Sequence, residues 1–132
     1  MTVTSNANSP GTATATLNSA SMGSCSVSTI IGNFPASVSL QGLPYQVEFA
    51  DSPGLPVTID NVSLSAAEVG ETCTFSANLN GSADNVSHGF QFSNQGFNLM
   101  SDTGSNCSSG TESVSLNGVV DEMAENFFVY VN

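Results

Sequence analysis

Apolar and polar residues alternate with a period of two along much of the chain, and turn residues separate the alternating runs. The clearest run extends from Gly70 to Gly81, where Cys73, Phe75, Ala77 and Leu79 alternate with polar neighbours. This spacing predicts a strand with one apolar face. The Asn-Gly pair that closes the run favours a tight hairpin turn, because both residues tolerate the positive φ that such a turn needs.

A second run, from Cys107 to Gly118, resembles the first. Val114 and Leu116 alternate with serine and asparagine, and the run again ends in Leu-Asn-Gly. We interpret the two runs as core strands of one β-domain that a disulfide staples together.

Shorter runs predict further strands, separated by clusters of Gly, Pro, Asn, Asp and Ser. The apolar residues after Asp60-Asn61 are out of phase with those before, and a bulge there explains the slip. Residues 66–69 predict one helical turn. The further strands are expected at residues 12–17, 22–28, 36–40, 45–49, 57–64, 90–94, 97–99 and 126–132.

Roughly nine or ten short strands at 8–12-residue spacing indicate a sandwich or barrel. With 132 residues, 39% of them hydrophobic, the chain suffices for one domain with a core. We therefore predict an all-β, single-domain antiparallel β-sandwich, Ig-like or jelly-roll-like and stapled by a disulfide. Residues 1–20 are assigned to an extended N-terminal arm, a candidate donor strand, and residues 21–132 to the sandwich.

The charge balance excludes two classes of partner. The chain has no Lys or Arg and 11 acids, which gives a formal net charge of −11. Nucleic-acid binding and attraction to anionic membranes both need basic side chains. Membrane insertion is not expected, because no run approaches the roughly 18 apolar residues of a spanning helix. No signal peptide is evident, so a secreted protein is expected to have lost it already.

Three cysteines in a small polar chain suggest an oxidising compartment. Cys73 with Cys107 is the preferred disulfide, because the two similar strands would place them at similar depths. Cys25 with either partner stays open, as do a bond between subunits and simple burial of Cys25. One histidine with three scattered cysteines is a poor zinc set, so no metal is expected.

The sequence offers little catalytic chemistry. His88 is the only candidate general base, and Asp84 lies four residues before it, but no Gly-x-Ser-x-Gly elbow is present. An exposed loop histidine is the favoured interpretation. We predict no enzyme, no catalytic residues and no cofactor.

Two other polar features also favour structural roles. Asp121, Glu122 and Glu125 could hold Ca²⁺ with loop oxygens, but they match no EF-hand, and a solvated acidic corner is favoured. Sequons are expected by chance in a chain so rich in Ser and Asn. They occur at Asn61, Asn80, Asn85 and Asn106.

Over roughly residues 22 to 118, several short motifs occur in a characteristic order: Cys25, Gly42-Leu43-Pro44-Tyr45, Ile59-Asp60-Asn61-Val62, Gly70-Glu-Thr-Cys73 leading to Asn80-Gly81, and Cys107-Ser-Ser-Gly110. They resemble small secreted bacterial proteins, the alkane-oxidation activators of the PraB type. Members often carry a further cysteine before the Gly-Leu-Pro step, where this chain has Ser37, Val38 and Ser39, so the resemblance leaves the disulfide pattern open. It implies a secreted, cell-surface β-domain linked to biofilm or hydrophobic substrates, without catalytic residues.

The terminal segments look exchangeable between subunits. The first alternates Thr with Ala, and the last is apolar on both faces, as in a strand buried on both sides or at an interface. In donor-strand complementation such a segment completes a neighbour's sheet, and head-to-tail repetition gives a filament. The alternative is that both strands pair within their own domain. The subunit-interface candidates are Val3, Ala13, Ala15, Leu17, Phe127, Phe128, Val129, Tyr130 and Val131.

These observations favour a non-enzymatic extracellular structural protein. It would be a subunit of a pilus-like surface fibre or biofilm matrix, assembled by β-strand addition. Its partners would be further copies of itself and components of the cell surface or biofilm matrix. The alternative is a monomeric secreted binding module for a carbohydrate or hydrophobic ligand, although the shortage of Trp and Tyr weakens a sugar platform.

Overall fold

The structure is a computed structural model of the chain. It describes residues 2–6, 12–23, 25–29, 32–50, 52–68, 70–84, 86–87, 89–103, 107 and 111–119. Its strands are β1 (Thr2–Asn6), β2 (Thr12–Leu17), β3 (Cys25–Thr29), β4 (Gly32–Gln41), β5 (Tyr45–Ala50), β6 (Pro56–Glu68), β7 (Glu71–Asp84), β8 (Gly89–Asp102) and β9 (Thr111–Val119).

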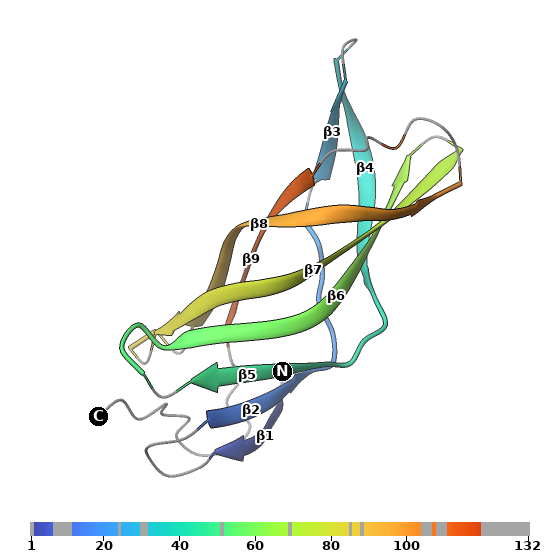
Figure 1. Cartoon of the computed structure of the whole chain (residues 1–132). Coiled ribbons are helices and arrows are strands. Elements are labelled where there is room, and N and C mark those ends of the chain that lie inside the picture. The colour runs from blue at the N-terminus through green and yellow to red at the C-terminus, as the bar shows by residue number, and fades with distance from the viewer. Residues whose placement is uncertain are drawn as a thin grey trace.

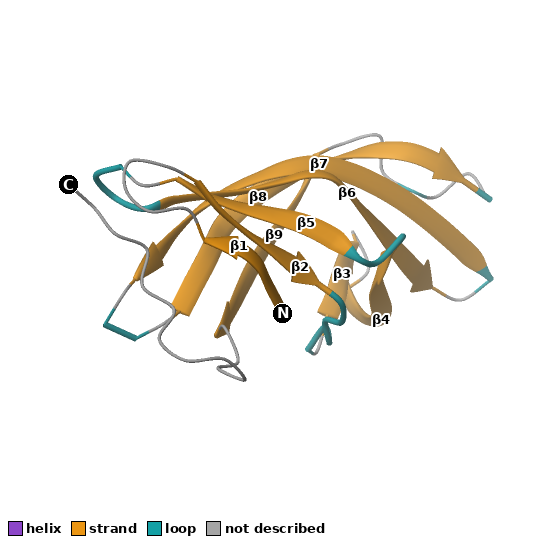
Figure 2. Cartoon of the chain, turned by 90° about the horizontal axis from the view of Figure 1, so that it is seen from below, coloured by secondary structure: helices purple, strands orange, loops and turns teal. Residues whose placement is uncertain are grey.

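All described strands join one antiparallel sheet. Along its main path the order is β1-β2-β5-β6-β7-β8-β9, and β4, which carries β3, branches from β6. The sheet is strongly curled, so that β9 lies behind β6 and β7 in Figure 1 and beneath them in the arch of Figure 2. The all-β antiparallel fold and its Cys73–Cys107 disulfide confirm the predicted fold class.

Strand β6 is the branch point of the sheet. One edge pairs with β7 along nearly its whole length, from Pro56 to Glu68. The other edge is shared, because β5 pairs near Val57 and Thr58 whereas β4 pairs over residues 63–67. The chain therefore leaves β4, crosses to β5 and returns along β6.

The core covers one face of the sheet. Residues directly opposite on neighbouring strands point to the same face, and the pairs Phe49–Val57 and Ile59–Leu79 are both buried. No polar or charged side chain is buried among the described residues. The buried residues are Ala13, Ala15, Val47, Phe49, Leu55, Val57, Ile59, Val62, Leu64, Cys73, Phe75, Leu79, Phe92 and Phe97.

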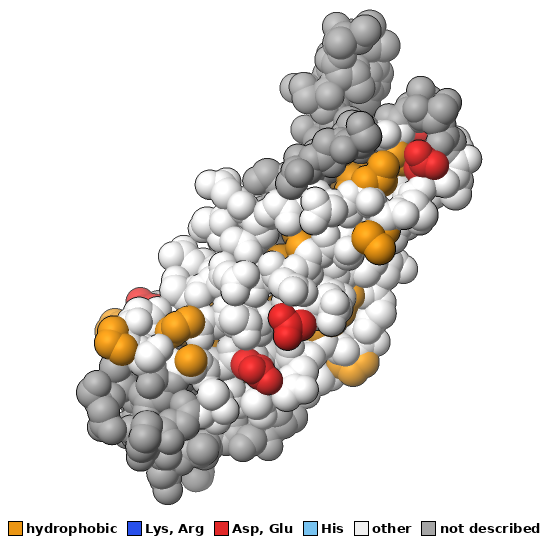
Figure 3. Space-filling view, viewed as in Figure 1, with side chains coloured by type: hydrophobic (Ala, Val, Ile, Leu, Met, Phe, Trp, Pro, Cys, Tyr) orange, Lys and Arg blue, Asp and Glu red, His pale blue; other side chains and the backbone are white. Residues whose placement is uncertain are grey.

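The opposite face is polar. Gln46, Glu48 and Asp60 are exposed. Thr58, which lies on β6 opposite Glu48, is half-buried. Figure 3 shows this face in the view of Figure 1, where hydrophobic side chains form only small, separate groups. One face thus supplies the core and the other meets solvent, as period-two alternation predicts.

The predicted slip near Asp60-Asn61 is confirmed. The β6–β7 register shifts between Ile59 and Val62, and Asn61 adopts φ 54°. Residues before and after the bulge therefore face the same core despite their odd spacing.

Two local predictions are wrong in the middle of the chain. Asn80 and Gly81 do not form a hairpin turn but lie inside β7, opposite Thr58 and Val57. Residues 66–68 form no helical turn, because they continue β6 opposite residues 71–73 of β7. The β6–β7 connection lies instead at Gly70, which has φ 84°.

The two strands predicted around Phe92 and Phe97 are one strand, β8. A register shift against β9 lies between Phe92 and Gln95, and Asn94 has φ 49°. The bulge keeps both phenylalanines buried although they are five residues apart. The polar residues between them mark this bulge and not the end of a strand.

Candidate functional site

The N-terminal strand β2 fills a place in the sheet beside β5. Its six residues pair without interruption with Tyr45–Ala50, so that Ala13 lies opposite Phe49 and Ala15 opposite Val47. The two alanines are 4% and 0% exposed, and Val47 and Phe49 are fully buried. Small side chains on β2 thus sit beside larger ones on β5, over the core.

Strand β2 covers the edge of β5 beside its buried side chains. Burying a Val or Phe side chain contributes about 1.5–3 kcal/mol relative to leaving it exposed. Removal of β2 would also leave the facing backbone N–H and C=O groups of β5 without their ladder partners. The edge of β5 is therefore a site that needs a strand.

The connection that follows β2 is a short exposed segment, here named the hinge segment, residues 18–23. It forms no strand, and all its residues are exposed except the half-buried Met22. It links β2 to β3 and runs behind the sheet in Figure 1. Through it, β1 and β2 are joined covalently to the rest of the described sheet.

Strand β1 pairs with β2, and the two form an antiparallel hairpin. Val3 of β1 lies opposite Ala15, and β1 has no second partner among the described strands. Of the predicted interface residues, Val3 thus lies in β1, Ala13 and Ala15 are buried beside β5, and Leu17 is partly buried against the core. The C-terminal candidates, residues 127–131, lie outside the described residues.

Strand β5 has its own attachment to the sheet, independent of β2. Phe49 and Glu48 pair with β6, and the Ser63 N–H donates a hydrogen bond of 2.9 Å to the Tyr45 hydroxyl. That hydroxyl also donates to the Gln41 carbonyl oxygen at the end of β4. Tyr45 therefore bridges β4, β5 and β6 where they diverge, a role that the alternation of the sequence did not reveal.

A small hollow lies on the polar face beside the β5–β6 pair. Gln46 and Glu48 of β5 and Thr58 and Asp60 of β6 line a volume of about 120 Å³. Carboxylate, amide and hydroxyl groups can bind the hydroxyls of a small polar ligand. The hollow lies on the face opposite the buried alanines.

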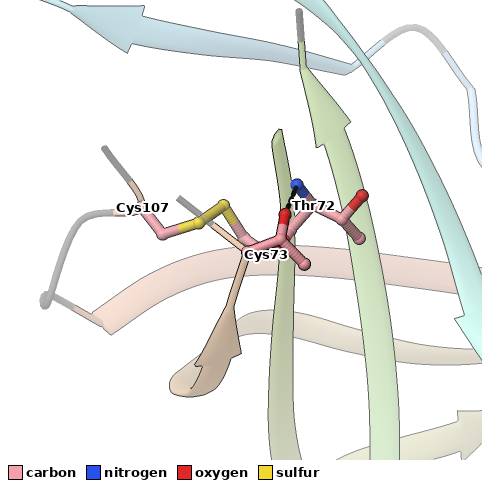
Figure 4. Close-up of a disulfide and its surroundings, with 4 residues drawn as sticks. Thr72, Cys73 and Cys107 are labelled. Carbon is pink, nitrogen blue, oxygen red and sulfur yellow. Dashed lines mark hydrogen bonds between the residues drawn. A yellow bond between two sulfur atoms is a disulfide. The ribbon is translucent and has the colours of Figure 1, made fainter. Parts of the chain in front are cut away.

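The disulfide joins Cys73 of β7 to Cys107, with a Cα–Cα distance of 5.8 Å (Figure 4). The preferred pairing is confirmed, although β8 lies between the two similar strands, which are not neighbours. The same region is held by Thr72, whose N–H donates to Thr103 Oγ1 at 2.9 Å and whose carbonyl accepts from the Thr103 N–H at 3.2 Å. Cys25 begins β3 and takes no part in this bond.

The remaining candidates lie apart from this region. His88, the acids at 121, 122 and 125, and the sequons at 85 and 106 lie outside the described residues. Asn61 and Asn80 are exposed positions of β6 and β7, and Asn61 forms the β6 bulge. Within the described ranges, no three His, Cys, Asp or Glu side chains gather as a metal site.

None of the described residues forms a helix with the length and apolar character of a membrane span. Comparison of the chain with protein-family models, curated proteins and solved structures finds no match. The functional argument therefore rests on the strands and edges themselves.

Proposed function

We propose that the protein is a non-enzymatic extracellular structural protein, a subunit of a surface fibre or biofilm matrix that assembles by β-strand addition. The observation that carries the proposal is the position of β2. It fills the core beside β5, and its covalent connection to the strands that follow runs through the exposed hinge segment. A strand of this kind can be supplied by the same chain or by a neighbour.

The composition supports a place outside the cell. Disulfides persist in oxidising environments, and Cys73 and Cys107 form one. The chain has no Lys or Arg, so it offers no trypsin site to surrounding proteases. The resemblance to secreted proteins of the PraB type points to the cell surface and to biofilm components as the setting, with further copies of the chain as the main partner.

The edge strand β1 bears on self-association in two opposite ways. Strand β1 lies at an edge of the described sheet and contains neither lysine nor proline, whereas its five-residue length and its irregular register between Val3 and Ser5 are features that natural sheets use to blunt an edge. Main-chain groups on such an edge can pair with another strand. Head-to-tail repetition of one such contact extends without closing, which gives a filament.

The test is the assembly state of the purified full chain, measured by light scattering and negative-stain microscopy over a range of protein concentrations. Fibres whose mass grows with concentration are the expected result. A monomer at every concentration would overturn the fibre proposal. Reduction of the disulfide in a parallel sample separates loss of the fold from loss of assembly.

The second candidate function is a monomeric binding module for a carbohydrate, and the hollow beside the β5–β6 pair favours it. Its lining of Gln46, Glu48, Thr58 and Asp60 suits sugar hydroxyls better than an apolar ligand. A glycan array probed with the full chain and with Asp60→Ala tests this candidate. Binding that is lost in the variant, from a protein that stays monomeric, would favour the module over the fibre.

A further inference from the structure

We propose that the exchanged element is the β1–β2 hairpin and that its acceptor is the β5 edge of a second copy of this chain. The donor strand is Thr12–Leu17, and the hinge segment opens to release it. This inference rests on the proposed function and deepens it, because it names the N-terminal segment as the donor. It also specifies the register in which one copy binds the next.

The fit of side chains selects the donor. Ala13 and Ala15 are buried in the core beside Phe49 and Val47. Well-packed cores resist added volume, so an Ala-x-Ala pattern is what this edge accepts. A threonine-alanine strand is thus shaped for β5 whichever copy supplies it.

The same contacts fix the register. A slip of one residue would turn Thr14 and Thr16 toward the core and leave their hydroxyls there without water. A slip of two residues in one direction would bring Leu17 to the place of Ala15, beside the fully buried Val47. Both slips are unfavourable, so a donor from another copy is expected to repeat the pairing of Ala15 with Val47.

Strand β5 has attachments to the sheet that do not depend on the donor. It is paired with β6 at Phe49 and Glu48, and the Tyr45 hydroxyl holds its first residue to Ser63. An edge that is already ordered spends little further conformational entropy when a strand binds. It can therefore receive a strand from its own chain or from another.

The hinge segment is the place where the chain would open for the exchange. Residues 18–21 are exposed and outside any strand, whereas Met22 packs against the core and would have to leave it if the segment opened there. The closed and exchanged forms then contain the same pairing of β2 with β5, and the balance between them depends on protein concentration. Each copy carries one donor and one acceptor, which permits an open chain of subunits.

The experiment mixes two variants that each gain a single cysteine, Thr16→Cys and Gln46→Cys. Thr16 lies directly opposite Gln46, and both belong to the polar face, away from the buried alanines. Opposed Cβ atoms on antiparallel strands lie about 4.5–5.5 Å apart, close to the span of a disulfide. Neither variant can form this bond within its own chain, so a disulfide between positions 16 and 46 reports β2 of one copy beside β5 of another.

The matched control mixes Thr12→Cys with Gln46→Cys. Thr12 lies opposite Ala50, four residues from Gln46, or roughly 13 Å along the strand. Both mixtures are prepared from unassembled protein and oxidised during assembly, and the native cysteines are the same in each. Non-reducing gels and mass spectrometry of peptides cut at acidic and aromatic residues identify the linked pairs.

The predicted result is an abundant disulfide between positions 16 and 46 of different copies in fibres, with no such link in the mismatched control. Fibres without that link would overturn the assignment of donor and acceptor and leave the fibre proposal standing. Linked pairs that close into dimers and never extend would support the assignment and overturn the fibre. Monomers without links would overturn both.

Discussion

Two asparagines allow long strands to follow a curled sheet. Asn61 and Asn94 both adopt the left-handed backbone conformation, which Asn tolerates better than most residues, and each lies at a bulge. Side-chain amides bind backbone groups beside these irregularities. The Asn61 N–H donates to Asn78 Oδ1 and the Asn80 N–H to Gln95 Oε1, each at 2.8 Å. These side-chain hydrogen bonds thus replace some of the backbone hydrogen bonds between strands that the bulges disrupt.

Gly81 shows why an Asn-Gly pair lies within a strand. A Cβ atom at this position would approach the Gln91 carbonyl oxygen and would lie 2.6 Å from a ring carbon of Phe92, which is 1% exposed. The close approach of β7 and β8 therefore requires glycine. The Asn-Gly pair resembles a hairpin turn in the sequence, but its glycine is required by the close packing of β7 and β8. Turn propensities alone do not distinguish a hairpin turn from such a packing requirement.

Gly81→Ala is expected to lower the free energy of unfolding by about 1–3 kcal/mol, the usual cost of overpacking a core. The physical reason is that a backbone oxygen and a buried ring would both have to move. Urea unfolding followed by circular dichroism measures the change. The matched control is Gly23→Ala, where a Cβ meets nothing within 4 Å. Equal stabilities of the two variants would contradict the packing argument.

At the scale of elements, the alternation of apolar and polar residues predicted strands correctly where strand formation depends on residues close in sequence. Strands β2 and β5 lie at the residues predicted for them, 12–17 and 45–49. The β6 bulge lies at Asn61, where the alternation of apolar residues shifts phase. Alternation could not show that β8 continues past Asn94, because the bulge mimics a strand end. It also could not show that β6 divides one edge between β4 and β5, since that choice depends on contacts distant in sequence.

The candidate site was predicted only in part for the same reason. The small residues of β2 pointed to an exchangeable strand, but the sequence did not name its partner. The partner is β5, across the whole β3–β4 hairpin in sequence, and the bridge made by Tyr45 depends on Ser63 and Gln41. Such pairings follow from the packing of the complete sheet.

The disulfide should contribute strongly to stability at this scale. Cys73 and Cys107 are 34 residues apart, and closing a loop of that length in the unfolded chain corresponds to about 3–4 kcal/mol in the chain-entropy model. Unfolding in urea with and without reductant measures this difference. It should persist in the Cys25→Ser variant, because Cys25 is not in the bond. A difference that disappears in that variant would contradict the assigned pairing.

At the scale of the whole molecule, charge opposes assembly. Each copy carries a formal net charge of −11 and no Lys or Arg, so neighbouring copies repel one another. Strand addition must overcome this repulsion through main-chain hydrogen bonds and buried apolar area. The salt concentration is therefore expected to influence the rate of fibre formation.

Assembly is expected to accelerate as ionic strength rises. The Debye length falls from about 30 Å at 0.01 M to about 8 Å at 0.15 M, which screens repulsion between copies. Light scattering at fixed protein concentration and pH gives the rate, and sucrose at matched osmolality serves as the uncharged control. Slower assembly in salt would indicate attraction between opposite charges, which a chain without Lys or Arg cannot supply through those residues.

The most direct measurement compares fibre formation by the full chain, by a chain lacking residues 1–6 and by a chain lacking residues 1–17. Negative-stain microscopy and light scattering should show fibres from the first two, which retain β2, and none from the third. Adding a peptide of residues 2–17 to the third should yield folded, capped monomers, because the peptide fills the β5 edge without providing a linked acceptor. Fibres from the chain lacking residues 1–17, or a truncated chain that the peptide does not restore, would contradict assembly through β2.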